Sequence, residues 1–192
     1  MAASSIDLGL DDALDAEIRR QWLLLADAGL PSLAEHPGVS NAPHVTLAQR
    51  RRLPPPDAVR RAAARLPVPL TLTGLLVLPT RRGLVLARAV TADDALLALH
   101  AEVVGLVDAA SDREPWPPAA HTAPGAWTPH VTLAVGLEPD QVARALDVLP
   151  LGVLSGEGTT LRHWDARAQE LTVLVPDVST LDRPGSGSGR QD

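Results

Sequence analysis

The chain lacks several residue types altogether. It has no cysteine, which excludes disulfides, thiolate metal sites and cysteine nucleophiles. It has neither phenylalanine nor tyrosine and only four tryptophans, so leucine, valine and alanine must form most of the core. Lysine is absent too, and every basic residue is an arginine. A chain of 192 residues is still long enough to bury a core, as one compact domain or as two closely packed halves.

Basic charge is also scarce. The formal net charge is −6, whereas proteins that hold long stretches of nucleic acid usually carry an excess of basic residues that neutralise phosphates. We therefore expect no broad surface for DNA or RNA. A short site for one or two phosphates needs only a few local donors and is compatible with this charge.

Long apolar segments are missing as well. Met1–Leu10 has no basic start and no long apolar run, so it does not resemble a signal peptide. No segment approaches the roughly 20 consecutive apolar residues of a membrane-spanning helix. We expect a cytoplasmic monomer that does not associate with membranes.

Three short segments occur twice, in the same order and at a nearly constant offset. They read Asp-Asp-Ala-Leu, Pro-His-Val-Thr-Leu-Ala and Pro-Asp-x-Val. The paired copies are Asp11–Leu14 and Asp93–Leu96, Pro43–Ala48 and Pro129–Ala134, and Pro56–Val59 and Pro139–Val142. This order predicts an internal duplication. We expect a single bilobal domain over residues 1–182, with lobes of roughly 1–80 and 81–178 that can exchange strands, followed by a disordered Gly/Ser-rich tail at 183–192.

Hydrophobic periodicity predicts the elements of each half. Apolar residues at helical spacing favour helices over 14–25 and 96–107, and Pro-Asp at the first turn favours further helices beginning at Pro56 and Pro139. The predicted strands are Ile6–Leu10, His44–Ala48, Val68–Leu78, Leu84–Val90, His130–Val135, Leu151–Arg162 and Leu171–Val175. Alternating strands and helices are typical of a parallel sheet, but the hairpin expected at 81–83 makes an α+β duplication equally natural.

The repeated hexapeptide places polar side chains on one face of a strand. Side chains alternate between faces, so His44 and Thr46 share one face while Val45 and Leu47 point to the other. His130 and Thr132 occupy the same positions in the second copy. If the duplication relates the halves by an approximate two-fold axis, the two His-Thr pairs face each other across a cleft.

Two facing histidines suit the hydrolysis of a phosphodiester without a metal. With ordinary pKa values near 6.5, one imidazole can be neutral and remove a proton while the other is charged and donates one. Two threonine hydroxyls can donate hydrogen bonds to the non-bridging oxygens. A single His-x-Thr on a strand is more often an exposed surface pair. Two copies in identical hexapeptides favour a functional role.

These motifs carry a resemblance to a known family. His44–Leu47 and His130–Leu133 resemble the paired His-x-Thr-hydrophobic motifs of the 2H phosphoesterase superfamily, specifically its 2'-5' RNA ligase and RNA 2',3'-cyclic phosphodiesterase group. The resemblance in element order extends to about residue 178. It implies an α+β fold with two antiparallel sheets around a central cleft and helices packed outside. It also implies that no cofactor or metal is needed, and that the partner is a nucleotide or RNA end with a cyclic or 2'-linked phosphate.

By the same resemblance, His44 and His130 form the acid/base pair, and Thr46 and Thr132 bind the phosphate. Two further residues are candidates for substrate binding. Continued alternation along the strand predicts that Arg50 emerges on the face of His44 and binds a second phosphate, or else lies at a solvated strand end. Trp127, three residues before His130, could cover a base or ribose, or could pack its loop against the protein.

Two alternatives remain open. The chain could be a non-catalytic protein that binds nucleotides or RNA ends, with measurable binding and no turnover. It could also join RNA ends through a 2'-5' bond, since the same two histidines would serve the reverse reaction.

Overall fold

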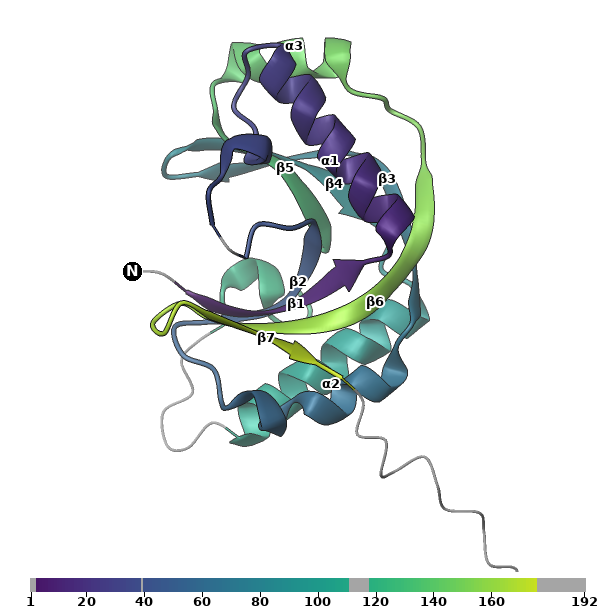
Figure 1. Ribbon diagram of the computed structural model, residues 1–192, viewed down its shortest axis with the longest axis vertical. Helices are drawn as coiled ribbons and strands as arrows, with labels where there is room; N and C mark the ends of the chain where they lie inside the picture. Colours follow the sequence, from purple (N-terminus) through teal and green to yellow (C-terminus); the bar gives the residue numbers. More distant parts are fainter. Residues whose placement is uncertain (1–2, 39, 111–117, 176–192) are drawn as a thin grey trace, which may run out of the picture.

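The computed structural model describes residues 3–38, 40–110 and 118–175 of the chain (Figure 1). Within these residues the α-helices are α1 (Asp12–Asp27), α2 (Asp94–Ala110) and α3 (Pro139–Val148). The strands are β1 (Ser4–Leu10), β2 (His44–Arg50), β3 (Val68–Thr80), β4 (Gly83–Val90), β5 (His130–Leu137), β6 (Leu154–Asp165) and β7 (Glu170–Leu174). The 3₁₀ helices are η1 (Leu33–Glu35), η2 (Pro56–Ala58), η3 (Arg60–Arg65) and η4 (Ala120–Thr122). All seven predicted strands form, with small shifts at their ends.

The Asp-Asp-Ala-Leu repeat forms the start of a helix in both halves. The Asp11 carboxylate accepts a hydrogen bond from the backbone N–H of Leu14 at 2.8 Å. The Asp93 carboxylate accepts from the N–H of Leu96 at 2.9 Å. Each bond satisfies one of the free N–H groups at a helix N-terminus, which is why this tetrapeptide precedes both α1 and α2.

The strands form one continuous antiparallel sheet in the order β2-β1-β6-β3-β4-β5, with β7 paired to the other edge of β6. We call β2, β1, β6 and β7 the first lobe, and β5, β4 and β3 the second lobe. The N-terminal part of β6 pairs with β3 and so joins the two lobes. The predicted α+β class, with antiparallel sheets and helices outside them, is confirmed. The two expected sheets run together through β6 and β3.

The two halves of the sequence exchange elements in space. β6 and β7 follow the second hexapeptide in the chain, yet β6 pairs with β1 in the first lobe. β3 precedes the second half and pairs with β4. The helices cross over as well: α1 contacts β5, and α2 contacts β2 (Figure 1). Each hexapeptide strand is therefore covered by a helix from the other half of the chain.

The prediction of a continuous helix beginning at Pro56 is wrong. The first copy of Pro-Asp-x-Val forms two short 3₁₀ helices, η2 and η3, whereas the second forms α3. The residue before η2 is Pro55, which has no side-chain acceptor for a helix cap. Before α3, the N–H of Glu138 donates to the Gln141 side chain at 2.9 Å in a capping box. The difference in capping accounts for the different helices.

One expectation falls outside the described residues, since the predicted tail at 183–192 lies beyond them. In the part of the chain that the structure describes, the helices are too short or too polar to cross a membrane.

Candidate active site

The two motif histidines are held in the same way at the start of β2 and β5. The Nδ1 atom of His44 lies 2.7 Å from the carbonyl oxygen of Ala42, and Nδ1 of His130 lies 2.7 Å from the carbonyl oxygen of Thr128. A carbonyl oxygen can only accept, so Nδ1 of each ring must donate. In the neutral rings the lone pair therefore resides on Nε2, which is the atom left to exchange a proton with a ligand.

A β-bulge follows each His-x-Thr and has the same form in both lobes. In β2, Asp7 pairs with Thr46 and Ile6 with Ala48, so Leu47 is the extra residue. In β5, Ala87 pairs with Thr132 and Leu86 with Ala134, so Leu133 is the extra residue. Bulges re-aim the side chains that follow them. Here they end the simple alternation directly after each threonine.

An indole N–H from elsewhere in the chain fixes each motif strand. Trp22 of α1 donates through Nε1 to the carbonyl oxygen of Thr132 at 3.0 Å, and Trp127 donates to the carbonyl oxygen of Thr46 at 3.0 Å. One face of Trp127 also stacks on His100, with ring centroids 4.0 Å apart. These contacts give Trp127 the packing role weighed in the sequence analysis. Its contact with a substrate stays a prediction.

The expected position of Arg50 is wrong. The bulge at Leu47 reverses the alternation, so Arg50 pairs with Ser4 on the face of the sheet opposite His44. Its side chain is buried and its Nη2 donates to Asp108 of α2 at 3.2 Å. Arg50 therefore ties α2 to β2 and does not lie beside the two histidines.

The electrostatic surroundings of the two motif histidines differ. Burial lowers the pKa of His130 below its ordinary value of 6.5, and the nearby His44 lowers it further, while the hydrogen bond to Thr128 acts in the opposite direction. His44 instead has Nε2 only 3.9 Å from Oδ1 of Asp7. The effect of His44 on the pKa of His130 agrees with the contact between β2 and β5, which brings the two motifs together.

A third imidazole lies near the pair. The ring centroid of His121, in η4, is 6.1 Å from that of His130. Burial and the charge of His130 both lower the pKa of His121. The sequence pattern offered no signal for His121, because its approach depends on how the loop before β5 folds back: the N–H of Thr128 donates to the carbonyl of His121 at 3.0 Å.

The sheet beside His44 carries two buried charged residues that the sequence analysis missed. Residues directly paired between antiparallel strands share a face, so Thr46 of β2, Asp7 of β1 and Arg162 of β6 form one row. Asp7 and Arg162 are 4% and 8% exposed, too little for ordinary surface charges. Ser5 donates to the Asp7 carboxylate at 2.9 Å. An aspartate within the otherwise apolar segment 6–10 was the only available signal.

The corresponding row in the second lobe is apolar. Thr132 of β5 pairs with Ala87 of β4, which pairs with Leu76 of β3. The two motifs therefore have matching strands and different neighbours on the sheet.

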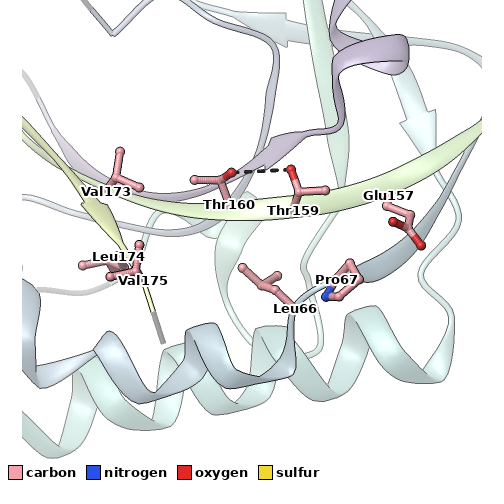
Figure 2. A pocket seen from close by; sticks show the side chains of 8 residues that line it. All are labelled: Leu66, Pro67, Glu157, Thr159, Thr160, Val173, Leu174 and Val175. Carbon is pink, nitrogen blue, oxygen red and sulfur yellow. Dashed lines mark hydrogen bonds between the residues drawn. The ribbon is translucent and has the colours of Figure 1, made fainter. Parts of the chain in front are cut away.

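A separate cavity of about 410 Å³ opens beside β6 and β7 (Figure 2). It is lined by Leu66, Pro67, Glu157, Thr159, Thr160, Val173, Leu174 and Val175. Neither motif histidine lines it. In the described part of the chain, no three histidine, cysteine or acidic side chains are grouped as a metal site would require.

Comparison with known proteins identifies the family. Three similar solved structures are LigT of E. coli complexed with 3'-AMP (18% identity, 91% of this chain and 93% of that chain, TM-score 0.48), Usb1 of Kluyveromyces marxianus with uridine monophosphate (14%, 90% and 97%, 0.46) and a phosphoesterase (18%, 92% and 96%, 0.47). No curated protein matches the chain. The model of the family described as the 2'-5' RNA ligase superfamily matches residues 11–180. Since this match covers most of the sequence and includes both His-x-Thr motifs, the chain belongs to the 2'-5' RNA ligase superfamily.

Proposed function

We propose that the chain is a metal-independent phosphodiesterase that hydrolyses a 2',3'-cyclic phosphate or a 2'-5'-type phosphodiester on a nucleotide or RNA end. The observation that carries this proposal is the equal arrangement of His44 and His130. Both rings donate from Nδ1 to a backbone carbonyl and keep Nε2 for a ligand. Thr46 and Thr132 are half-buried beside them on the same strands.

In the proposed reaction, Nε2 of one histidine removes a proton from water while the water oxygen bonds to phosphorus. The bond between phosphorus and the departing sugar oxygen breaks, and Nε2 of the other histidine gives that oxygen a proton. The hydroxyls of Thr46 and Thr132 donate to the non-bridging oxygens as negative charge accumulates there. One proton enters the site with water and one leaves with the sugar, so the pair returns to its starting state when the rings exchange a proton with solvent.

We assign the base role to His130 and the acid role to His44. The lowered pKa of His130 keeps its ring neutral near pH 7, so that it can accept a proton. The carboxylate of Asp7, 3.9 Å from Nε2 of His44, attracts the positive charge that an acid must carry. Asp7 pairs with Thr46 in the first lobe, and the residue that pairs with Thr132 in the second lobe is Ala87. The motif of His130 therefore has no carboxylate at the corresponding position.

The test is turnover of a panel of 2',3'-cyclic nucleotides and short RNAs ending in a cyclic phosphate, with EDTA present. We expect hydrolysis by the wild-type protein and a loss of about 10²- to 10⁴-fold in kcat for both His44→Ala and His130→Ala. His36→Ala is the matched control, since this histidine is exposed and outside the motifs. Unchanged rates in both motif variants, or strict dependence on an added divalent metal, would contradict the proposal. Binding of these ligands without turnover would support the non-catalytic alternative.

A further inference from the structure

Arg162 is a buried cation that has no partner among the described residues. Its residue is 8% exposed, and its Nε atom is buried with no hydrogen-bond partner. Among the residues that the structure describes, its guanidinium forms no hydrogen bond and no ion pair within 4.0 Å. Burying an uncompensated charge costs roughly several kcal/mol of folding free energy, so proteins rarely contain one that has no function.

Arg88 shows how this fold satisfies an arginine that serves structure alone. It is fully buried in the second lobe and lies on the helix-facing side of β4. Its guanidinium donates to the side chain of Gln21 at 2.9 Å and to the carbonyl oxygens of Thr73, Gly152 and Pro150. Arg162 lies in the row of Thr46 and Asp7, on the face of the sheet that carries His44. Its guanidinium has no such bonds among the described residues.

The side chain of Arg162 lies beside Gly9, in the part of the sheet next to the His44 motif. Burial, the largest effect, lowers the pKa of Arg162, and Arg19 also lowers it, whereas the carboxylates of Asp7 and Asp15 raise it. A guanidinium stays charged in proteins even so. A Cβ added to Gly9 would lie 3.9 Å from Nε of Arg162, and Gly9 pairs with His44. Gly9 thus places no side chain between the arginine and the histidine strand.

The row of Thr46, Asp7 and Arg162 presents polar groups in an order and at a spacing that a nucleotide can match. Neighbouring strands lie about 4.8 Å apart, so the row presents a hydroxyl donor, a carboxylate acceptor and a guanidinium donor at successive steps of about this length. Among the described residues, Oδ1 of Asp7 has no hydrogen-bond partner. A carboxylate at this step of the row would repel a phosphate and accept from a hydroxyl group. Phosphate, hydroxyl and phosphate in sequence describe a ribose with a phosphate on either side.

We propose that Arg162 binds a second phosphate of the substrate, on the far side of the ribose from the phosphate held by the two His-Thr pairs. Asp7 then accepts from the ribose hydroxyl that is free in a 2'-5'-linked substrate and in the opened product of a 2',3'-cyclic phosphate. This inference rests on the proposed function, since it takes the motif site to hold the first phosphate. It assigns the substrate as a nucleotide that carries a 5'-phosphate, such as the last nucleotide of an oligonucleotide. A guanidinium is suited to this role because it can bind two phosphate oxygens at once.

Calorimetric titration tests the assignment without requiring turnover. The ligands are adenosine 3'-monophosphate and adenosine 3',5'-bisphosphate, with the 2' isomers in parallel. We expect the wild-type protein to bind the bisphosphate about tenfold more tightly than the monophosphate. Arg162→Gln is expected to bind both ligands alike, with its monophosphate affinity unchanged within about twofold. Arg162→Lys, which keeps the charge without the planar fork, is expected to retain part of the preference. Arg60→Gln, which removes an arginine paired with Asp57, is the control and should behave as the wild type.

Three results would overturn the inference: no preference for the bisphosphate in the wild type, a full preference kept by Arg162→Gln, or an equal loss on both ligands. Failure of both Arg162 variants to fold would assign the residue to stability and overturn it as well. The proposed function fails separately, if the wild-type protein turns over no cyclic or 2'-5'-linked phosphate. A wild-type enzyme that hydrolyses cyclic monophosphates but ignores the second phosphate refutes only the role of Arg162.

Discussion

The two lobes hold their motif strands alike and differ in what lies beside them. In both, the histidine donates from Nδ1 to the carbonyl two residues earlier, a leucine bulge follows the threonine, and an indole N–H binds the threonine carbonyl. The row next to Thr46 contains Asp7 and Arg162, while the row next to Thr132 contains Ala87 and Leu76.

This difference teaches which parts of a duplicated site must match. The orientation of both histidine rings depends on local hydrogen bonds to the backbone, and both copies retain these bonds. The charge beside each ring depends on the neighbouring strands, whose sequences differ between the two lobes. The carboxylate of Asp7 lies 3.9 Å from Nε2 of His44, whereas burial lowers the pKa of His130. A symmetrical backbone can therefore support an asymmetrical pair of acid and base.

The largest effect is expected with a substrate whose leaving group departs without a proton. Such a substrate distinguishes the histidine that acts as the acid from the one that acts as the base. On a nucleoside 3'-(4-nitrophenyl phosphate), we expect His44→Ala to regain most of the wild-type rate, because nitrophenolate departs without an acid. His130→Ala should keep a loss of about 10²- to 10⁴-fold, since water must still be deprotonated. Release of nitrophenolate, followed by absorbance, measures both. The opposite pattern would exchange the two roles, and equal losses would mean that the lobes are equivalent in function.

The two buried arginines should differ in their effect on stability. Arg88→Met removes the donor to one side chain and three carbonyls and leaves these acceptors unsatisfied, so we expect it to lower the free energy of unfolding by roughly 3–5 kcal/mol. Arg162→Met removes a cation without bonds to the described residues, so its cost should stay below about 1 kcal/mol. Urea unfolding followed by circular dichroism gives both values. A cost at Arg162 as large as at Arg88 would show that both arginines serve the fold.

The smallest effect should be a difference in acid stability between the two covering helices. At matching positions after the Asp-Asp-Ala-Leu repeat, α1 carries Ile18 and α2 carries His100, both buried. Burial lowers the pKa of His100 in the folded state below 6.5, although the bond to Thr122 opposes this. The unfolded chain then binds more protons, so this contribution is absent well above pH 6.5 and destabilises the fold as the pH falls through 6.5 toward the folded pKa.

His100→Gln keeps a donor for the carbonyl of Thr122 and removes the titration. We expect the melting temperature of this variant to fall less than that of the wild type between pH 7.5 and 5.5. His36→Ala, at an exposed site, is the control. The same pH dependence in His100→Gln as in the wild type would exclude His100 as a source of acid sensitivity.

Local features were accessible from the sequence. Apolar residues at helical spacing predicted helices over 14–25 and 96–107, and the structure shows Asp11 and Asp93 of the repeated Asp-Asp-Ala-Leu capping them. Alternation within the hexapeptides placed His44 with Thr46 and His130 with Thr132. These predictions concern neighbours within a few residues, where strand geometry and capping bonds are decided by the residues themselves.

Arg50 marks the limit of such predictions. A single bulge at Leu47 moves it to the opposite face, because every residue after a bulge changes sides. A bulge arises from the register between two strands, here β1 and β2, and the pattern of one strand does not contain it. The same reasoning applies to the helix predicted at Pro56, where the absence of a capping side chain outweighed the periodicity.

The sequence by itself determined the duplication, the two motif strands and the His-Thr pairs to which we assign the proposed chemistry. Only the tertiary structure decided what surrounds them: β6 returns from the end of the chain to set Arg162 beside Asp7, and α1 and α2 cross to the opposite lobes. The physical reason is that imidazole charge depends on burial and on nearby carboxylates, and both come from segments distant in sequence. Residue order fixed which side chains each motif carries, and packing fixed the burial and the charges around them.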